Sequence, residues 1–343
     1  MGYGMSVTLK QNKIVYFIGA GASQASDFKL PSLKDFFKEG FEKEMYPNLY
    51  AFVEKHFPST KFEKLNLEEV ITFLELSFDK FGTFGNAISP YLYDARKEFS
   101  QYVYDRLNYE PIGGRNWCNK HKRYLEKING QDSVITLNYD LILERTLYEI
   151  QKDFQDHDSK IVERMSDLLG ATTQFWDGES PTIYSKHRSL GFLLKLHGSI
   201  NWFYCPREMC LNHQAFYQDY IHGKTFSSQG ELCKACGTPL TPVIIPPTMS
   251  KSFSQFPKLG FLWGLAYREL NKADKIVIIG TSFTPSDYYL RWLFKSSIAQ
   301  RPRELKPKIE VVDKDEGVCN KVEEITGLTP EFKGDFETFL GTF

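Results

Sequence analysis

The hydrophobic positions of the chain fall into short continuous runs, separated by longer stretches in which apolar residues recur every three or four positions. A strand that is covered on both faces has such a continuous run, whereas a half-exposed strand alternates. The runs are Ile14–Ile18, Val134–Leu137, Leu193–Leu196, Val243–Ile245, Lys275–Ile279 and Ile309–Val312. Because helical stretches separate these runs, the pattern predicts an α/β fold with a doubly wound, mostly parallel sheet.

Two stretches interrupt this alternation. Residues 33–130 are rich in aromatic side chains and have helical spacing, as in Leu67–Leu76, so we predict a helical module inserted after the first strand. Residues 204–241 carry four of the six cysteines and form a second, small insertion. Since no repeat or low-complexity linker is present, we interpret residues 1–343 as a single domain that contains both insertions.

Composition and charge disfavour some classes of function. The chain has 343 residues, 42% of them hydrophobic, and its 42 basic and 43 acidic residues give a net charge of −1. No basic block stands out, so we do not expect direct binding of nucleic acid. No apolar run reaches the roughly 18 residues that a membrane helix needs, and the first residues do not resemble a signal peptide. We therefore expect a cytoplasmic protein without a membrane segment.

The first predicted strand runs directly into a loop with two glycines and a serine, Gly19, Gly21 and Ser23. Glycines let a backbone turn tightly and approach a pyrophosphate, whose charge backbone N–H groups then meet. The alternative is a tight strand-to-helix turn without a ligand. A dehydrogenase would continue as G-x-G-x-x-G, but the third glycine is absent, which disfavours hydride transfer.

Polar side chains follow two further strands. Asn138 and Asp140 come directly after the run at 134–137, and His197 follows the run at 193–196. The carboxyl ends of strands in open α/β sheets assemble the ligand sites, so these residues are candidates for a reacting centre. The alternatives are a histidine satisfied within the core and an aspartate that holds its loop in an Asx turn.

Four cysteines in the second insertion form a C-x4-C pair and a C-x2-C pair. Such spacings suit a closed tetrahedral Zn2+ site, and Gly237 eases the turn after the second pair. The candidate ligands are Cys205, Cys210, Cys233 and Cys236. Four protein ligands leave no open position, so the metal would be structural. Free thiols and a redox pair are the alternatives, and Cys118 and Cys319 stand apart.

These motifs, GAGAS, TLNYD, LHGS, the four cysteines and a late GTS, occur in an order that resembles the sirtuin family. The resemblance covers the Rossmann-like core and the zinc insertion, and it leaves the helical module unexplained. It implies that NAD is the substrate and that the chain breaks the bond between nicotinamide and ribose.

The resemblance also implies roles for individual residues. Asn138 and Asp140 match the segment around the nicotinamide ribose, and His197 matches the catalytic histidine. The matched cofactor-binding residues are Gly19, Ala20, Gly21 and Ser23 in the phosphate loop, and Gly280, Thr281 and Ser282 at the adenosine half. Asp313 is a candidate for the adenosine ribose, and a cap of its own loop is the alternative.

The sequence departs from the deacylase pattern at two places. Either Asp27–Lys29 replaces D-F-R or Leu30–Pro31 replaces I-P, and in both alignments the arginine is missing. Tyr139 stands where deacylases tend to have isoleucine. The N-Y-D form is more similar to the bacterial sirtuin-like branch that hydrolyses NAD in defence against phage.

The implied function is thus an NAD+ glycohydrolase that forms nicotinamide and ADP-ribose and acts in antiphage defence by NAD depletion. The alternatives are an NAD-dependent protein deacylase, the related mono-ADP-ribosyl transfer, and a non-catalytic NAD or ADP-ribose sensor. The resemblance further implies homo-oligomers or a separately encoded partner, such as a ring-forming ATPase or an Argonaute-like protein.

Overall fold

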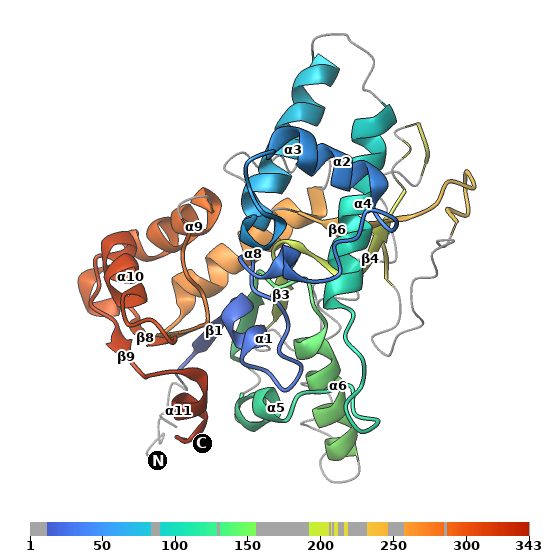
Figure 1. The fold of residues 1–343 in the computed structure, drawn as a ribbon. Coiled ribbons are helices and arrows are strands. Elements are labelled where there is room, and N and C mark those ends of the chain that lie inside the picture. The colour runs from blue at the N-terminus through green and yellow to red at the C-terminus, as the bar shows by residue number, and fades with distance from the viewer. Residues whose placement is uncertain are drawn as a thin grey trace, which may run out of the picture.

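The computed structural model describes residues 12–83, 90–128, 131–155, 192–205, 207, 209–211, 216–218, 232–245, 257–284 and 287–342, and Figure 1 shows its fold. Its main sheet has six strands in the order β3-β2-β1-β7-β8-β9, and all neighbours are parallel. The strands are β1 (Ile14–Ile18), β2 (Ser133–Thr136), β3 (Leu193–Lys195), β7 (Lys275–Ile279), β8 (Lys308–Val312) and β9 (Glu331–Phe332). This is the strand order of the Rossmann fold, and the predicted fold class is confirmed.

Helices cover both faces of this sheet, which explains why its strands are continuously apolar. Val15 and Phe17 face one core, and Tyr16 and Ile18 face the other. The first core is completed by α8 (Pro257–Lys272), α9 (Tyr288–Ala299) and α10 (Val318–Thr326), and the second by α5 (Asn119–Leu125), α6 (Ile142–Gln155) and α11 (Phe336–Leu340). In Figure 1, α9 and α10 lie at the left, and α5, α6 and α11 lie along the bottom. The short α1 (Ala20–Gln24) follows β1, and η3 (Arg303–Leu305) precedes β8.

A helical layer between β1 and β2 has a hydrophobic core of its own. It consists of η1 (Phe36–Lys38), α2 (Pro47–His56), η2 (Phe62–Lys64), α3 (Leu67–Thr83) and α4 (Pro90–Leu107). Its core extends to Tyr139, Ile142 and Ile200, so the layer packs against the loop after β2 and against β4. None of the helices in the described ranges is long and apolar enough to cross a bilayer.

A second, three-stranded antiparallel sheet follows β3. It has the order β5-β4-β6, with β4 (Gly198–Tyr204), β5 (Phe216–Gln218) and β6 (Thr241–Ile244). The run at 243–245, which the sequence pattern grouped with the parallel strands, therefore belongs to this other sheet. The chain leaves β3 through Gly198, which has φ +89°, and a Cβ there would lie 2.0 Å from the carbonyl oxygen of Val243. Only glycine allows this approach of β4 to β6.

Candidate functional site

A cavity of about 300 Å3 lies at the carboxyl edge of the parallel sheet, where β1 and β7 are neighbours. The chain reverses its direction of winding between these two strands, which is the usual place of ligand sites in such sheets. The cavity is lined by every residue predicted above as catalytic or cofactor-binding: Gly19, Ala20, Gly21, Ser23, Asn138, Asp140, His197, Gly280, Thr281, Ser282 and Asp313. Residues far apart in the sequence thus share one cavity.

The loops after β1 and β7 touch through their backbones. The N–H of Gly19 donates to Ile279 and that of Gly21 donates to Gly280, both at 2.9 Å. A Cβ on Gly19 would lie 2.5 Å from the Gly280 oxygen, and one on Gly280 would lie 2.3 Å from the Ala22 nitrogen. The fold itself therefore requires these glycines, and the amides of Gly19 and Gly21 are already used within the protein.

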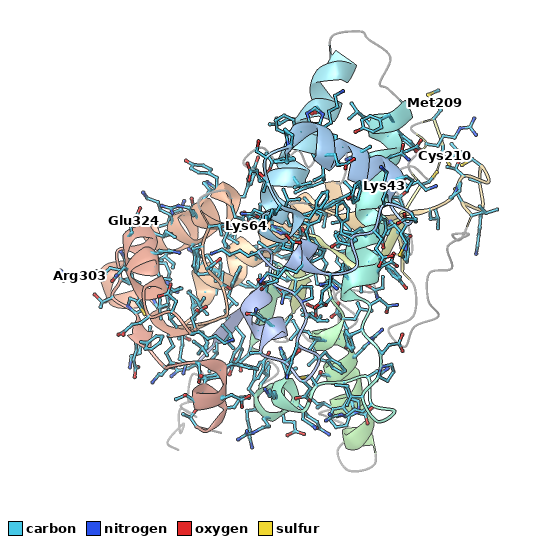
Figure 2. The ribbon with its side chains drawn as sticks, viewed as in Figure 1. Lys43, Lys64, Met209, Cys210, Arg303 and Glu324 are labelled. Carbon is cyan, nitrogen blue, oxygen red and sulfur yellow. The ribbon has the colours of Figure 1, made fainter. Side chains whose placement is uncertain are left out.

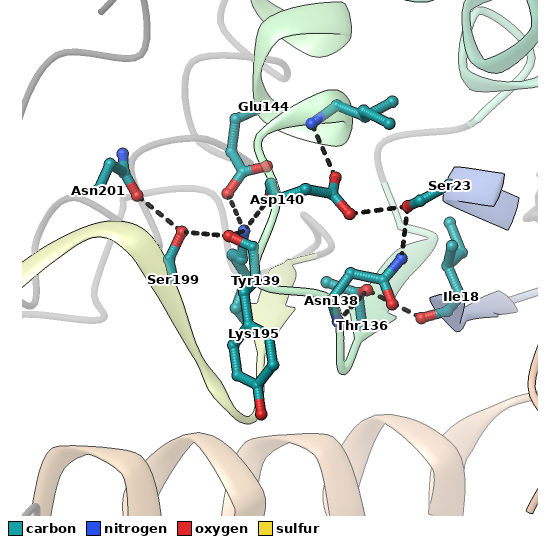
Figure 3. A network of polar contacts seen from close by, with 11 residues as sticks. Ile18, Ser23, Thr136, Asn138, Tyr139, Asp140, Glu144, Lys195, Ser199 and Asn201 are labelled. Carbon is teal, nitrogen blue, oxygen red and sulfur yellow. Dashed lines mark hydrogen bonds and ion pairs between the residues drawn. The ribbon is translucent and has the colours of Figure 1, made fainter. Parts of the chain in front are cut away.

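Ser23, Asn138 and Asp140 form a hydrogen-bonded group, shown in Figure 3. The Ser23 hydroxyl donates to Asp140 Oδ2 at 2.7 Å and accepts from Asn138 Nδ2 at 2.9 Å. Asn138 Nδ2 also donates to the carbonyl of Gly19 at 3.0 Å, so both of its amide hydrogens are used. Its Oδ1 is the remaining acceptor. Asp140 Oδ1 accepts from the N–H of Ile142, which is the Asx turn at the start of α6.

A buried ion pair lies behind this group and was not found from the sequence. Lys195 Nζ is 2.7 Å from Glu144 Oε1 and also donates to the carbonyls of Asp140 and Tyr139, at 2.5 and 3.4 Å. Burial raises the pKa of Glu144, and the charge of Lys195 opposes this shift. A lysine in a strand end gives no sequence sign of such a partner. Ser23, Asn138 and Asp140 line the cavity, Glu144 and Lys195 lie behind them, and we call these five residues together the cavity floor.

His197 is buried between two aromatic rings. Its ring centroid lies 6.2 Å from that of Tyr139 and 6.0 Å from that of Trp263, and the Trp263 ring is stacked on it. Nε2 of His197 lies 3.7 Å from Asp287 Oδ2, an ion-pair distance when the imidazole is protonated. The Tyr139 hydroxyl donates to the Ile245 carbonyl at 2.7 Å, and burial raises the pKa of Tyr139 well above its usual value.

Asp287 was not found from the sequence either. It precedes α9, and its Oδ1 accepts from the N–H of Leu290 at 3.3 Å, as an N-cap does. A Ser-Asp pair before a helix predicts only this capping role. The second carboxylate oxygen of Asp287 faces His197 because α9 begins at the rim of the cavity. Such a tertiary contact has no local sequence pattern.

The helical layer closes the cavity on its other side. Leu30, Pro31 and Phe36 line it, whereas Asp27, Phe28 and Lys29 do not. The segment at the cavity is therefore Leu30–Pro31, and no arginine follows it. Glu68, near the start of α3, accepts from Thr284 Oγ1 at 3.0 Å and so connects the layer with the loop after β7. Glu68 was likewise missed, because its partner is 216 residues away in the sequence.

The residues expected to bind the adenosine half of NAD differ in their hydrogen bonding. Thr281 Oγ1 is buried and has no hydrogen-bond partner in the described part of the chain. Asp313 Oδ1 accepts from the N–H of Asp315 at 3.0 Å, so this carboxylate does cap its own turn. Ser282 uses its carbonyl to accept from Lys321.

The four predicted cysteines converge at the end of the antiparallel sheet, and we call them the cysteine cluster. Their Sγ atoms all lie within 4.8 Å of one another, and the pairs 205–236 and 210–233 are 3.5 and 3.6 Å apart. Tetrahedral zinc with Zn–S of about 2.3 Å needs S–S distances of roughly 3.8 Å. Hydrogen bonding with Thr238 lowers the pKa of Cys236 to about 6. The cluster fits Zn2+, and Figure 2 shows Cys210 at the outer edge of the molecule.

Comparisons with known proteins give a distant likeness. No protein-family profile and no curated protein matches the sequence. Among solved structures, the chain is similar to Sir2Tm bound to a propionylated peptide, with 16% identity, a TM-score of 0.46, and coverage of 97% of this chain and 92% of that chain. A Sir2 homologue in complex with NAD has 17% identity, a TM-score of 0.44, and coverage of 97% and 88%. Such a distant likeness assigns no substrate to this chain.

Proposed function

We propose that this chain is a sirtuin-like NAD+ glycohydrolase, which converts NAD+ and water into nicotinamide, ADP-ribose and a proton. One observation carries the proposal: Asn138 and His197 line the same cavity as the loops after β1 and β7. This cavity lies at the point of the sheet where doubly wound folds bind dinucleotides. Binding alone requires neither an amide nor an imidazole at that place.

The proposed reaction divides the work between two side chains. Because both amide hydrogens of Asn138 are held by Ser23 and Gly19, its Oδ1 is fixed as an acceptor that orients a water or a ribose hydroxyl. His197 accepts the proton that the water releases. The C1′–N bond of the nicotinamide riboside breaks, the bond from C1′ to the water oxygen forms, and the proton passes from His197 to solvent.

Water is the proposed acceptor in place of an acylated lysine. The bulky Tyr139 is buried beside His197 and is fixed by its hydrogen bond to the carbonyl of Ile245, directly after β6. We propose that this ring occupies the space through which an acylated lysine would approach. The Leu30–Pro31 segment at the cavity also lacks the arginine of the deacylase pattern.

The wider setting follows from the motif resemblance alone. We place the activity in bacterial antiphage defence by NAD depletion, with homo-oligomers or a separately encoded partner such as a ring-forming ATPase or an Argonaute-like protein. We propose that the chain is one domain, with insertions at 33–130 and 204–241. In the second insertion, the cysteine cluster would hold a structural Zn2+, and parts of that insertion lie outside the described residues.

The test is release of nicotinamide from NAD+ by the purified protein, with and without an acetylated peptide. We expect release without peptide, and a loss of about 100-fold or more in Asn138→Ala and His197→Ala. Asn271→Ala and His56→Ala remove the same groups away from the cavity and should keep full activity. Release that strictly requires the peptide would favour deacylation, and tight NAD binding without any release would favour a sensor.

A further inference from the structure

We infer that Asp287 is the carboxylate partner of His197 and that it stabilises the protonated imidazole formed when His197 takes up a proton. The role rests on the proposed function, since it concerns the base of that reaction. Asp287 acts through His197, so we class it as a positioning residue.

The geometry supports the pair directly. Both side chains are almost fully buried, with exposed fractions of 2% for His197 and 3% for Asp287, and both line the cavity. The 3.7 Å between Nε2 and Oδ2 is an ion-pair distance, and it is too long for a strong hydrogen bond. The N–H of Leu290 holds Oδ1 of Asp287, which keeps the other oxygen directed to the imidazole.

Tyr139, Trp263 and Glu68 also lie in this region. Tyr139 stays a neutral phenol, because burial and then the charges of Asp287 and Glu68 raise its pKa well above the usual value. Trp263 is uncharged and donates its Nε1–H to the Leu196 carbonyl at 2.9 Å. Glu68, from α3, accepts a hydrogen bond from Thr284.

Lys195, two residues before His197, has its charge balanced by Glu144 at 2.7 Å. Asp287 places a carboxylate oxygen within ion-pair distance of the imidazole, at 3.7 Å. A carboxylate at this distance favours the protonated form of a histidine, and the effect is larger in a buried site than in water.

The decisive measurement is the pKa of His197 in the ligand-free protein, followed by NMR of labelled histidine and assigned with His197→Ala. We expect Asp287→Asn to lower this pKa by about one unit or more. Asparagine keeps an oxygen for the N–H of Leu290, and Asp287→Ser is a second neutral N-cap that should give the same shift. Asp335→Asn, the same change at the N-cap of α11, is the matched control and should leave the pKa unchanged.

An unchanged pKa of His197 in both Asp287 variants would overturn the inference.

A kinetic measurement gives a second test. In Asp287→Asn, kcat/KM should fall about 10-fold or more, and the acidic limb of its pH profile should move to lower pH because His197 is a weaker base. A wild-type protein that does not hydrolyse NAD+ would refute the proposed function, while the NMR titration would still decide whether the pair exists.

Discussion

The cavity floor and the cysteine cluster are both built from polar side chains, but they are stabilised in different ways. In the cavity floor, each side chain has partners within the protein, such as Ser23 between Asn138 and Asp140. In the cysteine cluster, the four Sγ atoms all lie within 4.8 Å of one another, an arrangement that suits a bound metal ion. We propose that the first region forms as the sheet folds, whereas the second needs a bound ion. Polar residues in one chain can therefore be fixed by packing or by a metal.

The largest expected effect is removal of the metal. We expect one Zn2+ per chain by elemental analysis, and none after Cys233→Ser with Cys236→Ser, because structural zinc contributes on the order of 10 kcal/mol to folding its site. Most of the helix content, measured by circular dichroism, should remain. Cys319→Ser, a cysteine outside the cluster, should keep the metal. If the wild-type protein folds without bound zinc, the two regions do not differ in how they are stabilised.

Breaking the ion pair of the cavity floor should have the next largest effect. Lys195→Met leaves Glu144 buried without its partner, so the free energy of unfolding should fall by about 3–5 kcal/mol in chemical denaturation. Adding Glu144→Gln to this variant should restore much of the loss. The control is Lys275→Met, which breaks a more exposed pair with Glu310 and should cost less than about 1 kcal/mol. Equal losses in both single variants would contradict the role of burial.

Acid should destabilise the sheet region independently of any metal. Burial lowers the pKa of His121 from its usual value of 6.5 to about 3. Between these two pH values, His121 binds a proton in the unfolded chain but not in the folded chain. Stability is then lost as the pH falls below about 6.5, by about 2 kcal/mol at pH 5. Denaturation of His121→Leu at pH 7 and pH 5 should show a correspondingly smaller difference. His56→Leu, at a less buried histidine, should reduce the difference less.

The smallest effect should come from Ser23→Ala. The change removes one hydroxyl between Asn138 and Asp140 and should lower the free energy of unfolding by about 1 kcal/mol. It should lower kcat for NAD+ hydrolysis more than it changes KM, because the amide of Asn138 loses one of its two anchors. Ser297→Ala, which removes a buried hydroxyl that donates to the Phe294 carbonyl within α9, is the control for stability. Unchanged kcat in Ser23→Ala would mean that Gly19 alone orients the amide.

Much of the fold could be predicted from local patterns. The strands at 14–18, 275–279 and 308–312 lie within one residue of their predicted bounds, because a buried parallel strand has a continuous apolar run. The run at 243–245 was placed in the wrong sheet, since a short apolar run looks the same in either one. The strand Gly198–Tyr204 was missed because it begins directly after β3, at a glycine turn.

The candidate site likewise contains residues that the sequence predicted and residues that it missed. Strand ends and glycines led to Asn138, His197 and the two loops, because these positions follow from the order of strands in the sheet. Asp287, Glu68 and Lys195 were missed, and each of them acts through a partner from another element. A sequence pattern reports interactions between residues that are close together in the chain. The three missed contacts join residues that are 51 to 216 positions apart, so no local pattern indicates them.

The glycine contact between the loops after β1 and β7 limits how the protein can move. The two halves of the sheet meet there backbone to backbone, with Gly19 and Gly21 packed against Gly280. A hinge at this seam would first have to separate the ladder of β1 and β7. We therefore expect a molecule that enters the cavity to meet a rigid wall of backbone on this side.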